Sequence, residues 1–177
     1  MKPVGIIILN WNGAALLRRY LPSVVAANSN DIADVVVVDN GSTDPDTLAF
    51  LAALETEAPW AGRARVIDLP EEFNWSAGAN AGAAVANGDY LLFLDNDTYV
   101  VHEEWLDRLM GIAQRSDVGI VGPRLNYPET AKVQHTGWVL GLGGSTPYRY
   151  DKAHLVPFGE FVPYGFHWFV KLMNMPL

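Results

Sequence analysis

The stretch LFLDND, residues 92–97, ends an apolar run with two carboxylates that are one residue apart. Because alternate residues of a strand face the same way, Asp95 and Asp97 are expected to point together just beyond a buried strand. Carboxylates this close raise each other's pKa and need a partner, usually a hard divalent cation with open positions for phosphate oxygens. The stretch therefore predicts a metal–phosphate site. The alternative is a strand that ends in a polar Asp-Asn turn without further function.

Strand and helix patterns alternate on both sides of this stretch. Short apolar runs, several of them rich in β-branched residues, predict strands at residues 4–9, 35–38, 65–69, 90–94 and 118–121. Helical spacing, small residues and helix start and end signals predict helices at residues 14–27, 45–57, 77–86 and 103–115. This alternation predicts an α/β fold, in which a mostly parallel sheet is flanked by helices.

Four polar clusters follow the predicted strands, at residues 10–13, 39–44, 74–80 and 95–97. In open parallel sheets, ligands bind beyond the carboxyl ends of the strands, where these clusters would meet at one edge. One polar strand end is ordinary, but four together predict a binding site at this edge.

Two of the clusters leave alternatives open. Asp39 could accept hydrogen bonds from a base or a ribose hydroxyl, whereas an Asx turn or a helix cap explains the same residues without a ligand. The segment Ser76–Gly82 has almost no side-chain bulk, so either a ligand or the sheet can approach it closely. Asn80 is the more specific residue of this segment.

Composition narrows the class of protein. The chain has 177 residues, a net charge of −8 and no cysteine, and half of its residues are hydrophobic. The negative charge argues against nucleic acid as a partner, and the missing thiol excludes disulfides, zinc–thiolate sites and a cysteine nucleophile. We find no signal peptide and no stretch near the roughly 20 apolar residues of a membrane span. We expect a cytoplasmic protein, at most associated with the inner face of the membrane.

A change of composition marks a boundary near residues 141–147. After this glycine-rich segment the periodic pattern stops, and aromatic residues and prolines become frequent. We therefore divide the chain into a domain at residues 1–146 and an irregular tail at residues 147–177.

The ordered motifs resemble those of the family 2 glycosyltransferases, over roughly residues 3–145. The resemblance is carried by IIILNWNG (6–13), VVVDNGSTD (36–44), NWSAGANAG (74–82), GDYLLFLDND (88–97), VGIVGPRLNY (118–127) and QHTGWVLGLGG (134–144). It implies a nucleotide-sugar-binding domain of the Rossmann-like GT-A type, truncated here. It also implies inverting transfer of a sugar from a UDP or dTDP donor to a hydroxyl of a glycan or lipid-linked acceptor, in the synthesis of cell-surface polysaccharide.

The resemblance assigns roles to the nucleotide-site residues. Asp39 would bind the uracil or thymine base. Asn10 and Asn12 would lie on the loop that encloses the nucleotide, and Asn80 would line the donor pocket.

The resemblance also assigns Asp95 and Asp97 to the catalytic DxD motif, with Asp97 as the more direct metal ligand. The metal, Mn²⁺ or Mg²⁺, would bridge the diphosphate and stabilise the leaving nucleotide.

Inverting transfer also requires a general base, and no residue here matches the family's base. Glu103 and Glu104 follow the DxD motif, but their position better fits the start of a helix. His135 is either a pocket residue or a structural histidine.

The tail contains a second resemblance, because DKAHLVPFGEFVP (151–163) is similar to a motif of the apolipoprotein N-acyltransferases, whose domain is nitrilase-like. The resemblance would make Lys152 part of a Glu-Lys-Cys catalytic set, supported by Glu160. Without a cysteine the thioester chemistry cannot run, so we expect a fragment joined to a shortened glycosyltransferase. Two alternatives are an inactive nitrilase-type acyltransferase fragment and a non-catalytic module that self-associates through the apolar residues 155–170.

Overall fold

The computed structural model describes residues 3–26, 32–57, 61–70, 73–127, 133–135 and 138–141. It divides the chain into two compact units, Met1–Leu106 and Asp107–Leu177. The boundary expected at residues 146 and 147 lies outside the described residues, as does the tail with Lys152 and Glu160. That division of the chain stays a prediction.

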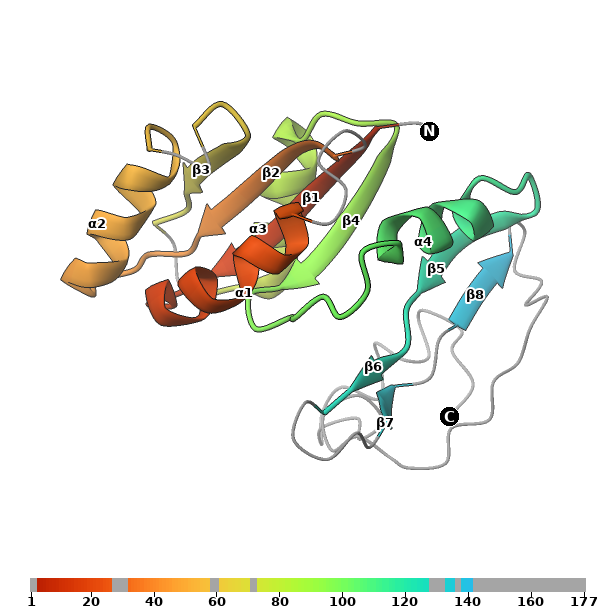
Figure 1. Cartoon of the computed structure of the whole chain (residues 1–177). Coiled ribbons are helices and arrows are strands. Elements are labelled where there is room, and N and C mark those ends of the chain that lie inside the picture. The colour runs from red at the N-terminus through yellow and green to blue at the C-terminus, as the bar shows by residue number, and fades with distance from the viewer. Residues whose placement is uncertain are drawn as a thin grey trace, which may run out of the picture. The chain divides into compact units, whose positions relative to one another are not determined.

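The first unit contains a four-stranded parallel sheet in the order β3-β2-β1-β4 (Figure 1). Its strands are β1 (Val4–Asn10), β2 (Ile32–Asp39), β3 (Ala64–Asp68) and β4 (Tyr90–Asp95). Its helices are α1 (Ala14–Ala26), α2 (Pro45–Leu54) and α3 (Trp75–Val85). The predicted α/β fold with a mostly parallel, helix-flanked sheet is confirmed.

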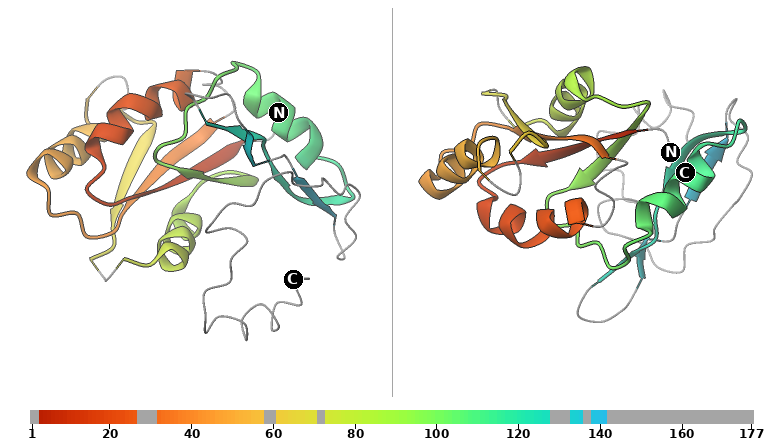
Figure 2. Two further views of the ribbon diagram at one scale, coloured as in Figure 1. Left: turned by 90° about the horizontal axis from the view of Figure 1, so that it is seen from below. Right: turned by 45° about the horizontal axis from the view of Figure 1, so that its top comes forward.

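Helices cover both faces of this sheet (Figure 2). Apolar side chains of α1 and α2 pack on one face, against residues that include Ile6, Ile8 and Val37. The residues between these, Ile7, Val36 and Val38, pack on the other face against the C-terminal part of α3. Because successive side chains point to opposite faces, the central strands β1 and β2 must be apolar on both, which explains their continuous β-branched runs.

The small residues of α3 serve close packing on the sheet. A Cβ on Gly78 would lie 3.0 Å from a methyl carbon of Leu9. A Cβ on Gly82 would clash with Ile7 and lie 3.0 Å from Val38. Of the two interpretations of this helix, the structure shows the packing one for Gly78 and Gly82.

In the second unit the strands pair antiparallel. β5 (Val118–Gly122) pairs with β8 (Trp138–Gly141), and β6 (Leu125–Asn126) pairs with β7 (Val133–His135). The alternation of strands and helices had placed residues 118–121 among the parallel strands, and this expectation is wrong. Strands as short as β6, β7 and β8 show too few alternations to be recognised from sequence.

Helix α4 (Trp105–Ala113) begins two residues later than predicted, because Glu103 and Glu104 form a turn before it. Among the described residues, no helix is long and apolar enough to cross a membrane.

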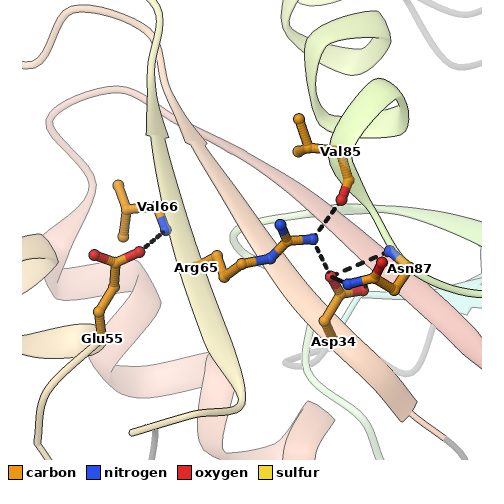
Figure 3. Close-up of polar contacts among 6 residues, drawn as sticks. All are labelled: Asp34, Glu55, Arg65, Val66, Val85 and Asn87. Atoms are coloured by element: carbon orange, nitrogen blue, oxygen red, sulfur yellow. Dashed lines mark hydrogen bonds and ion pairs between the residues drawn. The ribbon is translucent and has the colours of Figure 1, made fainter.

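A cluster of polar contacts joins β2, β3 and the segment before β4 at the amino ends of the strands (Figure 3). Asp34 of β2 is buried, pairs with Arg65 of β3 and accepts hydrogen bonds from the Asn87 backbone N–H at 3.0 and 3.2 Å. Arg65 also donates to the Val85 carbonyl at the end of α3. The cluster therefore fixes where the chain leaves α3 and enters β4.

Replacing Asp34→Ala should destabilise the protein by about 2 kcal/mol, because the Asn87 and Arg65 donors lose their buried acceptor. Urea unfolding followed by circular dichroism measures this. Asp117→Ala removes the exposed ion pair to Arg115 and should leave the midpoint almost unchanged. Equal midpoints for the two variants would contradict the role of Asp34.

Gly82→Ala and Gly111→Ala should have opposite effects, although both place alanine in a helix. A Cβ at Gly82 overpacks the contact between α3 and the sheet, which costs about 1–3 kcal/mol. A Cβ at Gly111 meets nothing within 4 Å, so the better helix propensity of alanine should add about 0.5–1 kcal/mol. Denaturant midpoints of the two variants check the signs, and stabilisation by Gly82→Ala would refute the packing.

Candidate functional site

The candidate site lies at the carboxyl edge of the parallel sheet in the first unit. In the strand register, Asn10 of β1 is opposite Asp39 of β2, and Leu9 is opposite Asp95 of β4. Parallel pairing thus brings the ends of three strands to one level, as the sequence predicted. The loops that follow them are joined by side-chain hydrogen bonds.

Asp39 is the central acceptor of this edge. The residue is only 4% exposed, and its Oδ1 accepts hydrogen bonds from Asn10 Nδ2 at 2.9 Å and from Ser42 Oγ at 2.6 Å. Its Oδ2 accepts the Ser42 backbone N–H, three residues further on, at 3.1 Å, one residue beyond the spacing of an Asx turn. The helix cap that we considered is present at Asp44, which accepts the Thr47 N–H at 2.9 Å before α2, and base binding by Asp39 stays a prediction.

Asn12 joins the β1–α1 loop to the β2–α2 loop. Its side-chain oxygen accepts the backbone N–H groups of Thr43 at 2.8 Å and Asp44 at 2.9 Å, and its own N–H donates to Ser42 Oγ at 2.7 Å. It adopts a φ of 47°, which asparagine tolerates better than most residues. The neighbouring Trp11 is 58% exposed, so solvent can reach its ring.

Asn40 is a site residue that the sequence argument missed. Its Nδ2 donates to the Leu69 carbonyl after β3 at 3.0 Å, and its Oδ1 accepts the Asn74 N–H before α3 at 2.9 Å. Asn74 then caps α3 by accepting the Ala77 N–H at 3.0 Å. The only signal in the sequence was its position beside Asp39 at a strand end.

The acidic pair lies in a tight turn. β4 ends at Asp95, and the Thr98 N–H donates to the Asp95 carbonyl at 3.1 Å, so Asn96 and Asp97 are the central residues of a turn. The polar Asp-Asn turn that we considered is therefore present, and Asp97 does not continue the strand alternation. Partial burial raises the pKa of the Asp95 carboxyl above its ordinary value, and the negative charge of Asp97 raises it further.

This turn offers an incomplete coordination shell. Within the described part of the chain, no group of three or more histidine or acidic residues is placed to hold a metal. Two neighbouring carboxylates, of which Asp97 raises the pKa of Asp95, suit a hard cation, whose other positions would go to water and phosphate. Carboxylate oxygens are the ligands that a hard divalent cation such as Mg²⁺ or Mn²⁺ would take at this turn.

Asn96 and Val100 anchor the acidic turn to the rest of the unit. Asn96 Nδ2 donates to Asn10 Oδ1 at 3.3 Å, and the Val100 N–H donates to Ser23 Oγ on α1 at 3.1 Å. The sequence argument missed Asn96 because its partner lies 86 residues away.

The other predicted residues belong to other elements of the chain. Asn80 is exposed on α3, whose buried face contains Gly78, Ala79 and Gly82. Glu103 and Glu104 lie in the turn before α4, and His135 is the last residue of β7 in the second unit. The structure therefore joins Asn10, Asn12 and Asp39 to the acidic turn, and their ligand roles stay predictions.

A parallel sheet flanked by helices, with polar loops and an acidic turn at its carboxyl edge, defines the class of α/β folds that bind ligands at this edge. The sequence model of Glycosyl transferase family 2 matches residues 5–172, and the chain belongs to this family.

Two curated relatives show how this chain compares with longer proteins. The O-antigen biosynthesis protein RfbC of Myxococcus xanthus is 39% identical over 143 residues, which is 80% of this chain and 11% of the relative. The apolipoprotein N-acyltransferase of Ralstonia nicotianae is 62% identical over 47 residues, which is 25% of this chain and 9% of the relative. Both predicted resemblances are confirmed, and the chain spans only a small part of the length of each relative.

Among solved structures, the mannosyltransferase PcManGT of Pyrobaculum calidifontis, in complex with GDP-Man and Mn²⁺, matches with a TM-score of 0.61 and 21% identity. The match covers 73% of this chain and 37% of that chain. It confirms the GT-A type of fold.

Gly13→Ala should destabilise the site by about 1–3 kcal/mol, because a Cβ would overlap Asn10 Oδ1 and lie 2.7 Å from Asn96 Nδ2. Thermal unfolding of this variant measures the cost, with Gly111→Ala as the control for adding the same methyl group in open space. An unchanged melting temperature for Gly13→Ala would contradict the tight junction.

Proposed function

We propose that this chain provides the donor half of an inverting glycosyltransferase, which transfers a sugar from a nucleoside-diphosphate sugar to an acceptor hydroxyl with metal assistance. The observation that carries the proposal is the bonded set of Asp39, Asn10 and the turn Asp95–Asp97 at one sheet edge. Membership of the family and the GDP-Man and Mn²⁺ complex of PcManGT support it.

In this proposal, Asp95 and Asp97 hold the divalent cation, and Asp97 is the more direct ligand. The cation supplies positive charge where the departing nucleoside diphosphate gains negative charge. The hydrogen bonds from Asn96 and Val100 hold the turn in place, so little reorganisation is needed when the donor binds.

Asp39 and Trp11 bind the nucleoside in this proposal. A base N–H donates to the Asp39 carboxylate, and the exposed Trp11 ring offers a face on which a base can stack. The hydrogen bonds of Asn12 to the Thr43 and Asp44 N–H groups hold together the two loops beside the base. Asn80 is a further residue of the donor pocket. We propose a UDP or dTDP donor.

The acceptor in this proposal is a glycan or lipid-linked hydroxyl in cell-envelope polysaccharide synthesis, in line with the O-antigen role in the name of RfbC. We place the reaction in the cytoplasm or at the inner membrane face. Self-association through residues 155–170 stays a prediction. The nitrilase-type alternative is less well supported, because the chain has no cysteine to form a thioester.

Calorimetric titration with UDP, dTDP and GDP, with and without Mn²⁺, tests the proposal. We expect metal-dependent binding that Asp97→Ala weakens by about tenfold or more, because a carboxylate ligand is lost. Asp89→Ala is a matched control, since it removes an equal charge just before the other end of β4. Equal metal-dependent binding by Asp97→Ala, or no binding of any of the three nucleotides by folded protein, would refute the proposal.

A further inference from the structure

Asn96, Asn10 and Asp39 form a continuous chain of side-chain hydrogen bonds across three strand ends. We propose that Asn10 is a positioning residue that couples base binding at Asp39 to metal binding at the turn Asp95–Asp97, through its hydrogen bond with Asn96. The inference rests on the proposed function, and it adds that the two halves of the donor site communicate through the protein as well as through the donor.

Chemistry fixes the direction of these hydrogen bonds. An ionised carboxylate only accepts, so the Asn10 amide must present its NH₂ group to Asp39 and its oxygen to Asn96. Asn96 must therefore present its own NH₂ group to Asn10, as observed at 3.3 Å. Neither amide can rotate by half a turn without placing two donors or two acceptors against each other.

Burial makes the chain costly to break. Asn10 is 1% exposed and Asp39 is 4% exposed, so water cannot readily replace a lost partner. Gly13 packs against the contact between the two amides, since a Cβ there would overlap Asn10 and crowd Asn96. A shift of the Asn10 amide must therefore be followed by Asn96.

Base binding would cause such a shift. The carboxylate of Asp39 already accepts hydrogen bonds from Asn10, Ser42 Oγ and the Ser42 N–H. A base N–H that adds to this set must share or displace one of these donors. The displacement of the Asn10 amide passes to Asn96 through their hydrogen bond. Asn96 stands between Asp95 and Asp97 in the sequence.

Free nucleosides isolate this coupling, because they have no phosphate and cannot contact the metal through one. The experiment measures Mn²⁺ affinity from the electron paramagnetic resonance signal of free Mn²⁺, with and without saturating uridine, thymidine or guanosine. We expect the nucleoside that binds to change Mn²⁺ affinity by about fivefold or more, and Mn²⁺ to change the nucleoside affinity by the same factor.

Asn96→Ala and Asn96→Leu both remove the donor, and the leucine also keeps most of the side-chain volume. In each variant we expect Mn²⁺ and nucleoside still to bind singly, with Mn²⁺ affinity lowered because the turn loses its bond to Asn10, and with a coupling factor close to one. Gln114→Ala removes an exposed amide in the second unit and should keep the wild-type factor. A general loss of structure would weaken both single affinities, so the coupling factor separates positioning from stability.

Two results would overturn the inference while leaving the proposed function intact. One is metal-dependent UDP, dTDP or GDP binding without coupling between nucleoside and Mn²⁺ in the wild-type protein. The other is a full coupling factor in both Asn96 variants. If none of the nucleotides binds at all, the proposed function and the inference fail together.

Discussion

The parallel register of β1 with both of its neighbours is the constraint on which the site depends. It places Asn10 opposite Asp39 and Leu9 opposite Asp95, so residues distant in sequence reach one edge. At the other edge, Asp34 holds the segments that enter β3 and β4. A slip of one residue in β2 would separate Asp39 from Asn10 and Asp34 from the Asn87 N–H, so these buried polar contacts at the two ends of the strand favour this register.

Electrostatics and hydrogen bonding divide the acids of this edge into two kinds. Asp39 is buried, and its oxygens accept hydrogen bonds from Asn10 and Ser42. Asp95 has a raised pKa, caused by partial burial and by Asp97, and the turn gives it no comparable set of donors among the described contacts. A cation would supply the positive charge that these hydrogen-bond donors do not, so the pair Asp95 and Asp97, and not Asp39, suits a metal.

The chain is similar to two kinds of protein over very different lengths. The family match extends over residues 5–172, whereas the acyltransferase relative is 62% identical over a stretch of only 47 residues. A short stretch of high identity does not transfer a catalytic activity, because function belongs to a complete site and not to a fragment. Among the described residues, the hydrogen-bonded polar side chains of the candidate site lie in the first unit, at the ends of β1, β2 and β4.

The sequence by itself determined the strand–helix alternation, the parallel sheet and the identity of the polar strand ends, because periodicity and turn chemistry are local properties. It left open whether Asp97 lies on a strand or in a turn. It did not determine that β5 pairs antiparallel or that Gly82 serves packing, since both depend on which segments meet. Only the tertiary structure joined Asn96 to Asn10 across 86 residues and Asn40 to the segments after β3 and before α3. Hydrogen bonds between distant loops leave no periodic signal in a sequence, so the connections within the site became visible only in the folded chain.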